Sequence, residues 1–97
     1  MATITRNGIR LSYDDIVAGE PGIVFVHGWT CDRSFFGPQA EHCARRHRVV
    51  SVDLRGHGQS DEPLEPYSID AYADDIAYLI GELGLGKVVA VVDQGRW

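Results

Sequence analysis

The sequence predicts an α/β fold in which a β-hairpin is followed by a β-α-β-α-β unit with three parallel strands. Three observations support this prediction. Apolar, mostly β-branched runs occur at Ile23–Val26 and Val88–Val92, as expected of parallel strands covered on both faces, and the valine-rich segment Arg48–Leu54 indicates a further strand between them. Segments with helical features separate these runs. A tight hairpin signal, Asn7-Gly8, lies near the amino terminus.

The first two strands are predicted from the residues around Asn7-Gly8. Ala2–Arg6 alternates in polarity before this turn, and a second strand follows it. On the second strand, one face carries Ile9, Leu11 and Tyr13 and the other carries Arg10 and Ser12. Asn and Gly both accept the positive φ angles of a type I′ turn, so the two strands should pair as a hairpin.

A first helix is predicted between the first two parallel strands. Ser34 is a candidate N-cap for a helix over Phe35–Arg46. Gly37-Pro38 lies awkwardly inside this range, because proline breaks a helix interior. Proline is favoured in a first turn, so the helix could also begin only at Pro38.

The second helix has the clearest pattern in the chain. Ser68 is its predicted cap, and Gly84 and Gly86 end it. Its apolar residues recur at spacings of three and four, which predicts a buried stripe. They are Ile69, Tyr72, Ala73, Ile76, Ile80 and Leu83.

The composition is that of one soluble globular domain with 97 residues and a net charge of −5. This charge argues against a nucleic-acid partner, since phosphate binding requires a basic face. Seven acidic residues follow one another without Lys or Arg between them, and a solvated helix face and loop explain them. They are Asp61, Glu62, Glu65, Asp70, Asp74, Asp75 and Glu82. The basic cluster Arg45–Arg48 lies where the first helix should end, and cations there complement the helix dipole; anion recognition is the alternative interpretation.

The remaining composition predicts a cytoplasmic protein. Cys31 and Cys43 match no metal-ligand pattern, and no secretory segment precedes Thr3. A reducing compartment with free thiols is then the expectation. No apolar run approaches membrane-spanning length, so no membrane association is expected.

Two motifs at strand ends resemble those of α/β-hydrolases. Ile23–Trp29 is an apolar strand that ends in His-Gly-Trp, and Asp53–Ser60 matches the pattern Asp-x-Arg-Gly-x-Gly-x-Ser that follows the next strand in many members. The resemblance extends from the amino terminus to about Val91. It implies that His27, Gly28 and Trp29 form the oxyanion loop, with the Trp29 N–H as one donor to the developing negative charge. It also implies a single, incomplete hydrolase domain over residues 1–97 with a divergent tail over about 92–97.

Both histidines of these motifs also have a structural interpretation. His27 and Gly28 could merely shape a turn, with the imidazole bonded to the backbone. His57 is interpreted as structural rather than as a general base, because no carboxylate that would orient it is identifiable. The family resemblance places the catalytic histidine much further along the chain. Gly56 and Gly58 are expected to supply backbone with positive φ.

The segment after the last parallel strand departs from the family pattern. Relatives carry their nucleophile there at the centre of Gly-x-Ser-x-Gly, whereas ungapped alignment places Gln94, which is not nucleophilic, at the serine. A shift by one residue makes Asp93 a carboxylate nucleophile, as in relatives that attack alkyl halides or epoxides. Val91 would then crowd the turn, and Thr30 stands where those relatives commonly have proline. A truncated or miscoded gene with a short unrelated tail is the simpler explanation.

Three functions remain open. The first is a serine hydrolase of esters, lactones or similar carbonyl substrates, which this chain alone would not complete. The second is a dehalogenase or epoxide hydrolase relative that uses Asp93. The third is a non-catalytic half-domain, which would associate with itself or with a separate C-terminal half through an open edge at Val88–Val92. A small-molecule substrate is expected in the first two cases, and no metal or organic cofactor is implied.

The family topology predicts where the site lies. The third parallel strand should return to the opposite side of the first, which places the two helices on opposite faces. The strand order then reverses between the strands that end at Val26 and Val92, and open α/β sheets bind ligands at such a point. The Trp29 loop and Asp93 should therefore be neighbours. Uncovered apolar surface should make the chain marginally stable and prone to associate.

Overall fold

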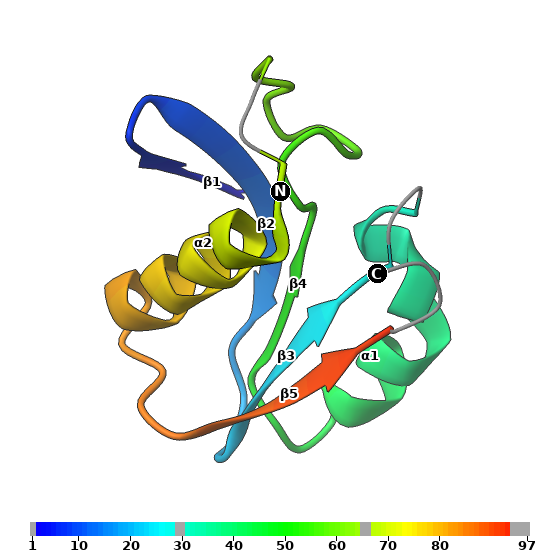
Figure 1. The fold of residues 1–97 in the computed structure, drawn as a ribbon. Coiled ribbons are helices and arrows are strands. Elements are labelled where there is room, and N and C mark those ends of the chain that lie inside the picture. The colour runs from blue at the N-terminus through cyan, green and yellow to red at the C-terminus, as the bar shows by residue number, and fades with distance from the viewer. Residues whose placement is uncertain (1, 29–30, 65–66, 94–97) are drawn as a thin grey trace.

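The computed structural model describes residues 2–28, 31–64 and 67–93 and confirms the predicted order of elements. The helices are a short 3-10 helix at Arg33–Phe36, α1 at Gly37–Cys43 and α2 at Ile69–Glu82. The strands are β1 at Ala2–Arg6, β2 at Ile9–Ile16, β3 at Gly22–Val26, β4 at Val49–Val52 and β5 at Val88–Val92. Figure 1 shows them as one sheet with helices packed on it. Neither α1 nor α2, nor any other helix in the described residues, is long and apolar enough to cross a membrane.

The five strands form one mixed sheet in the order β1-β2-β4-β3-β5. The pairs β1–β2 and β2–β4 are antiparallel, while β3 pairs in parallel with both β4 and β5. The chain therefore steps from β3 to β4 on one side and returns to β5 on the other, as predicted. In the described residues β5 is an edge strand.

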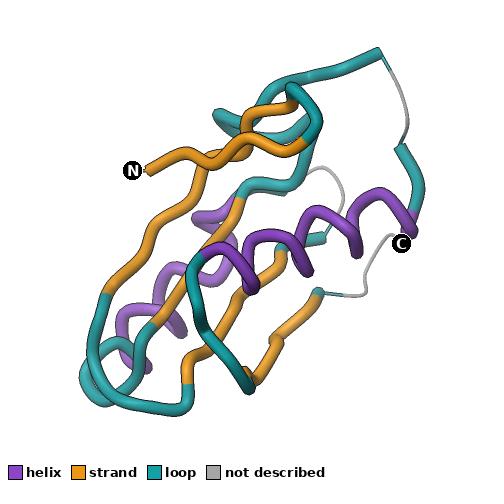
Figure 2. The backbone as a smooth tube through the Cα atoms, turned by 90° about the vertical axis from the view of Figure 1, so that its left-hand side faces the viewer, coloured by secondary structure: helices purple, strands orange, loops and turns teal. Residues whose placement is uncertain are grey.

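The two helices cover opposite faces of this sheet, which confirms the prediction. Successive side chains of a strand point to opposite faces. Val24 and Val26 of β3 pack in a core cluster with Leu79 of α2, whereas Phe25 packs with Ala40 of α1. Figure 2 shows the strands passing between the two helices.

The hairpin forms as predicted and β4 is shorter than expected. Asn7 has φ 50° and Gly8 has φ 79°, the positive pair that a type I′ turn requires. The predicted strand Arg48–Leu54 is shortened to Val49–Val52. At its start, the backbone N–H of Arg48 donates to the carbonyl of Gly19 in a loop instead of to a strand. The N–H of Leu54 donates to a side chain.

The start and end of the first helix differ from the prediction. Ser34 is not its cap, because the carboxylate of Asp32 accepts the Ser34 N–H at 2.9 Å and caps the preceding 3-10 helix instead. Pro38 lies in the first turn of α1, so the later start is the correct alternative. The helix ends at Cys43 rather than at Arg46. The chain turns after Cys43, and the N–H groups of Arg46 and His47 both donate to the carbonyl of Cys43.

The second helix begins as predicted, but its buried face differs. The Ser68 hydroxyl accepts the Ala71 N–H at 3.1 Å, and Gly84 follows the helix at φ 62°. Ile69 is 64% exposed, whereas Leu79, outside the predicted stripe, is fully buried. Asp75 is also buried, which corrects its assignment to a solvated acidic face. The sheet covers only part of the apolar stripe, and an internal ion pair holds Asp75.

Candidate active site

The candidate site lies where β3 and β5 end side by side. Val26 is opposite Val92 in the parallel register, and the N–H of Asp93 donates to the carbonyl of Val26 at 3.0 Å. A methyl group added to Gly28 would lie 2.3 Å from Oδ2 of Asp93. The predicted meeting of the His27 turn with the tip of the valine-rich strand is therefore confirmed. Trp29 and Gln94 lie outside the described residues.

His27 connects the loops that follow β3 and β4. The imidazole is 1% exposed, and its Nε2 accepts the Leu54 N–H at 3.0 Å. Nδ1 therefore carries the proton and donates to the carbonyl of Gly28 at 2.7 Å. Burial lowers the pKa of His27, although the hydrogen bond to Gly28 opposes this effect. With both nitrogens engaged by the backbone, this side chain positions the loop and does not transfer a proton.

His57 packs beside His27 within the second motif. The two ring centroids are 5.1 Å apart, and Nδ1 of His57 lies 3.0 Å from the carbonyl of Arg55. The contact is with the chain two residues away, so the imidazole stabilises its own loop. This geometry favours the structural interpretation of His57 over a role as general base.

Asp53 is the centre of a buried polar network that sequence reasoning did not single out. Its carboxylate accepts the hydroxyl of Ser12 at 2.6 Å and the N–H groups of Arg33 at 2.6 Å and Gln59 at 3.0 Å. The Arg33 guanidinium also contacts it. Burial by itself raises the pKa of Asp53, but these hydrogen bonds and the Arg33 charge outweigh burial, so the pKa lies below its usual value. The network joins the segment that contains Arg33, after β3, to the end of β4.

The last serine of the second motif completes this network. The Ser60 hydroxyl donates to the backbone carbonyl of Asp53 at 2.6 Å and accepts the Ser12 N–H at 2.8 Å. Gly58 has φ 50°, and a methyl group there would lie 2.4 Å from Cγ of Asp53. The motif thus needs its glycine for both backbone conformation and space. Its aspartate and serine are structural groups in this chain.

The arginine of the motif anchors the same loop to α2. Nε and Nη2 of Arg55 donate to the two carboxylate oxygens of Asp75, each at 2.7 Å. Both side chains are almost completely buried, and Arg6 adds a third contact to Asp75 at 3.1 Å. The sequence did not indicate this partner on the helix, because periodicity alone assigned Asp75 to solvent.

A groove about 690 Å³ in volume adjoins the site between α2 and β5. It is almost entirely apolar. Its lining is Val26, Ile69, Tyr72, Ala73, Ile76, Ala77, Ile80, Ala90 and Val92. Several of these side chains belong to the stripe predicted to be buried, so this groove is where that stripe remains uncovered.

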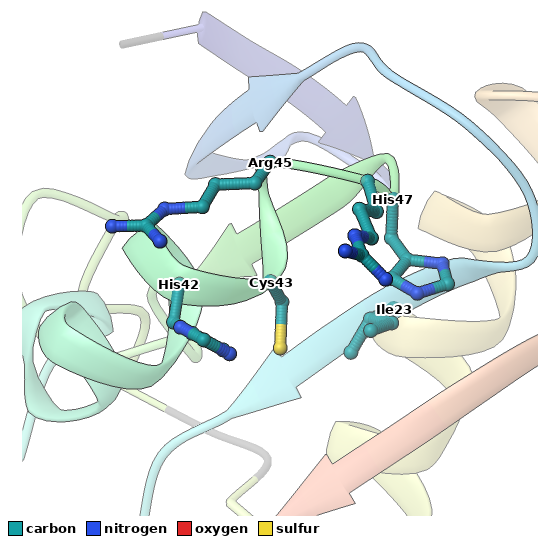
Figure 3. Close-up of a pocket in the computed structure, with 6 residues that line it drawn as sticks. Ile23, His42, Cys43, Arg45 and His47 are labelled. Atoms are coloured by element: carbon teal, nitrogen blue, oxygen red, sulfur yellow. The ribbon is translucent and has the colours of Figure 1, made fainter.

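Three residues of the predicted basic cluster, Arg45, Arg46 and His47, line a different hollow, of about 470 Å³, at the amino end of β3. Figure 3 shows His42 and Cys43 of α1 facing it together with His47. Nδ1 of His47 lies 3.1 Å from the carbonyl of Pro21, which ties the ring to the turn before β3. This hollow is at the opposite end of the strand from Gly28. Among the described residues, no three His, Cys, Asp or Glu side chains are arranged to hold a metal ion.

The fold and the position of the site define a class of protein: an open α/β sheet with its site at the point where the strand order reverses. Comparison with known proteins identifies the family. The chain matches the family model of the alpha/beta hydrolase fold over residues 21–92. It belongs to the α/β-hydrolase family.

Individual relatives show which part of the fold is shared. The AB hydrolase superfamily protein YisY of Bacillus subtilis is 40% identical over 86 residues, which is 88% of this chain and 32% of that protein. The structure of an N-acyl homoserine lactone degrading enzyme has a TM-score of 0.85 and 31% identity and covers 92% of this chain. An epoxide hydrolase from Vigna radiata has a TM-score of 0.85 and 32% identity and covers 94%. This chain covers 34% and 29% of those two structures, so it spans about a third of its relatives.

Proposed function

We propose that the chain forms the first part of the active site of a hydrolase that acts on an ester, lactone or similar carbonyl substrate by a serine mechanism. His27, Gly28 and Trp29 form its oxyanion loop. The sequence contains no Gly-x-Ser-x-Gly, and all four of its histidines precede residue 58. The 97 residues therefore have no turnover of their own. A small-molecule substrate, a cytoplasmic location and the lack of a cofactor belong to the same proposal.

The observation that carries this proposal is the close approach of Gly28 to the tip of β5. Acyl transfer places negative charge on a carbonyl oxygen, and fixed backbone N–H groups stabilise that charge when they lie beside the nucleophile. Gly28 has no side chain to fill this space, and His27 holds the turn through two backbone hydrogen bonds. A loop fixed in this way is pre-organised, which such a donor requires.

A chimera tests this role directly. Residues 1–91 of this chain would replace the matching part of the N-acyl homoserine lactone degrading enzyme, which supplies its own residues beyond that point. We expect the chimera to hydrolyse nitrophenyl butyrate, and we expect a Gly28→Val chimera to lose about 100-fold or more in kcat, since one oxyanion donor accounts for that much. The 97-residue chain alone should show no turnover. A folded chimera whose activity is indifferent to Gly28→Val would refute the oxyanion assignment.

Asp93 supports a second candidate function. Its carboxylate lies against Gly28, close to where a carboxylate nucleophile would attack an alkyl halide or an epoxide. Epoxide hydrolases are also among the similar structures. Val91 and Thr30 disfavour this candidate, as the sequence indicates. Turnover of a haloalkane or styrene oxide by the 97-residue chain, abolished by Asp93→Asn, would establish this candidate. If the unmodified 97-residue chain turns over neither substrate, the candidate is excluded.

A further inference from the structure

We propose that two copies of this chain pair through β5 in antiparallel fashion, about a two-fold axis at Ala90, to form one continuous sheet. The interaction surface is the outer edge of β5 together with the apolar groove beside it. The partner is a second copy of the chain. The pairing is argued from the strand itself rather than from the hydrolase assignment, and it uses the same edge of β5 through which a separate C-terminal half would associate.

The backbone of β5 determines which groups are available for such pairing. The Asp93 N–H donates to the carbonyl of Val26, so the odd-numbered residues of β5 direct their backbone groups toward β3. The even-numbered residues, Val88, Ala90 and Val92, direct theirs away from the sheet. No strand in the described part of the chain pairs with them. An uncharged edge of this kind is a template for another strand.

The sequence of the strand is symmetric about Ala90. Residues 88–92 read Val-Val-Ala-Val-Val, with Lys87 before them and Asp93 after them. In an antiparallel pair centred on Ala90, this alanine faces its own copy in a hydrogen-bonded pair and Val88 faces Val92. Each valine meets a valine, and the smallest side chain lies on the axis.

The charges at the two ends fit the same register. Lys87 and Asp93 are equally far from Ala90, so each Lys87 lies opposite Asp93 of the second copy. One ion pair between Lys87 and Asp93 then lies at each end of the paired strands, with five uncharged residue pairs between them. Opposite charges directly across strands stabilise pairing, whereas a shift in register would separate them.

The uncovered apolar surface follows the same symmetry. A two-fold axis perpendicular to the sheet keeps α2 of both copies on one face. Ala90 and Val92 line the groove beside α2, so the two grooves meet across the axis. Val92 is 47% exposed and Ile69 is 64% exposed in the single chain. Their placement beside the axis gives this apolar surface a partner of the same kind.

Charge reversal tests the partner and its orientation. Sedimentation velocity on the 97-residue chain should show a dimer at micromolar concentrations. Lys87→Glu alone, and Asp93→Lys alone, should each raise the dissociation constant about tenfold, because both cross-strand pairs become repulsive. A mixture of the two variants should restore dimerisation, because every pair in the heterodimer is attractive. A monomeric wild-type chain, or a mixture no tighter than its components, would overturn the proposal.

Cysteine cross-linking tests the register separately. In a background with Cys31→Ser and Cys43→Ser, Ala90→Cys should form an intermolecular disulfide readily, since a hydrogen-bonded pair has Cα atoms about 5.5 Å apart. Val89→Cys is the matched control, because its two copies would be about 8 Å apart, beyond disulfide reach. Equal cross-linking at both positions would refute this register. Large aggregates, or capture only by a C-terminal hydrolase segment, would refute the closed dimer.

Discussion

The loop after β4 and the edge strand β5 border the same candidate site, but they are stabilised in opposite ways. In the loop, Asp53 and Arg55 are buried and their charges are matched by several hydrogen bonds. On β5, by contrast, Val89 and Val92 remain about half exposed. A saturated polar network tolerates no loss of a partner, whereas an uncovered apolar strand tolerates change but favours association. The two regions should therefore respond very differently to mutation.

The largest effect is expected at the ion pair between Arg55 and Asp75. Asp75→Ala leaves the Arg55 guanidinium buried without its carboxylate, which should cost about 3–5 kcal/mol of the free energy of unfolding. That loss approaches the whole stability of a small domain. Urea unfolding followed by circular dichroism, at one fixed protein concentration, measures it.

Asp74→Ala is the matched control, because the Asp74 side chain, next to Asp75 in the sequence, is 66% exposed. It should change the free energy of unfolding by less than about 0.5 kcal/mol. If Asp75→Ala does not fold, the double variant Arg55→Met/Asp75→Leu should recover stability, since apolar residues can replace a buried pair. Equal losses at positions 74 and 75 would contradict the role assigned to the buried pair.

A second contrast lies along α2 itself. Leu79 is fully buried under the sheet, so Leu79→Ala should cost about 2–5 kcal/mol. Ile69→Ala, on the part of the helix beside the open groove, should cost less than about 0.5 kcal/mol in the monomer. The measurement is again the midpoint of urea unfolding, at a concentration where the chain is monomeric. Similar losses would mean that the groove is closed in solution.

A third contrast compares two glycines with positive φ. Gly58→Ala should cost about 2–3 kcal/mol, because the new methyl group meets the fixed carboxylate of Asp53 in addition to the strained backbone. Gly8→Ala, where the added methyl group has no neighbour within 4 Å, should cost only about 1 kcal/mol. Thermal unfolding of the two variants side by side measures the difference. Equal losses of stability in Gly58→Ala and Gly8→Ala would show that the Asp53 carboxylate moves away from the added methyl group.

Local sequence patterns predicted the fold because the elements that form it have strong local signals. Asn7-Gly8, Ser68 and the valine-rich run at 88–92 each specify their own conformation. The buried face of α2 could not be predicted in the same way, since helical periodicity does not reveal how much of a stripe the sheet covers. Ile69 and Asp75 were assigned to the wrong environments for that reason.

The candidate site divides along the same line. The pairing of β3 with β5 follows from topology, so the approach of Gly28 to Asp93 could be predicted. The network around Asp53 depends on Ser12 and Arg33, which are distant in sequence and have no motif of their own. A recognisable signal was present in the motif Asp-x-Arg-Gly-x-Gly-x-Ser, but the motif alone does not reveal that its aspartate, arginine and serine form internal hydrogen bonds with Ser12, Asp75 and the backbone.

The smallest expected effect concerns His27, which lies between the two regions. Burial keeps its folded-state pKa below the ordinary value of 6.5, so the unfolded chain binds a proton first as the pH falls. The contribution of neutral His27 to the free energy of unfolding is therefore fully present above about pH 6.5. It declines as the pH falls from there toward the folded-state pKa, by at most about 1.4 kcal/mol for each pH unit. Urea unfolding at several pH values between 5 and 8 measures this slope. His27→Gln should remove it, whereas His42→Gln, which changes an exposed imidazole, should leave it intact. If the pH dependence of the free energy of unfolding survives in His27→Gln, the proton that is taken up on unfolding binds to another group, and His27 is not its source.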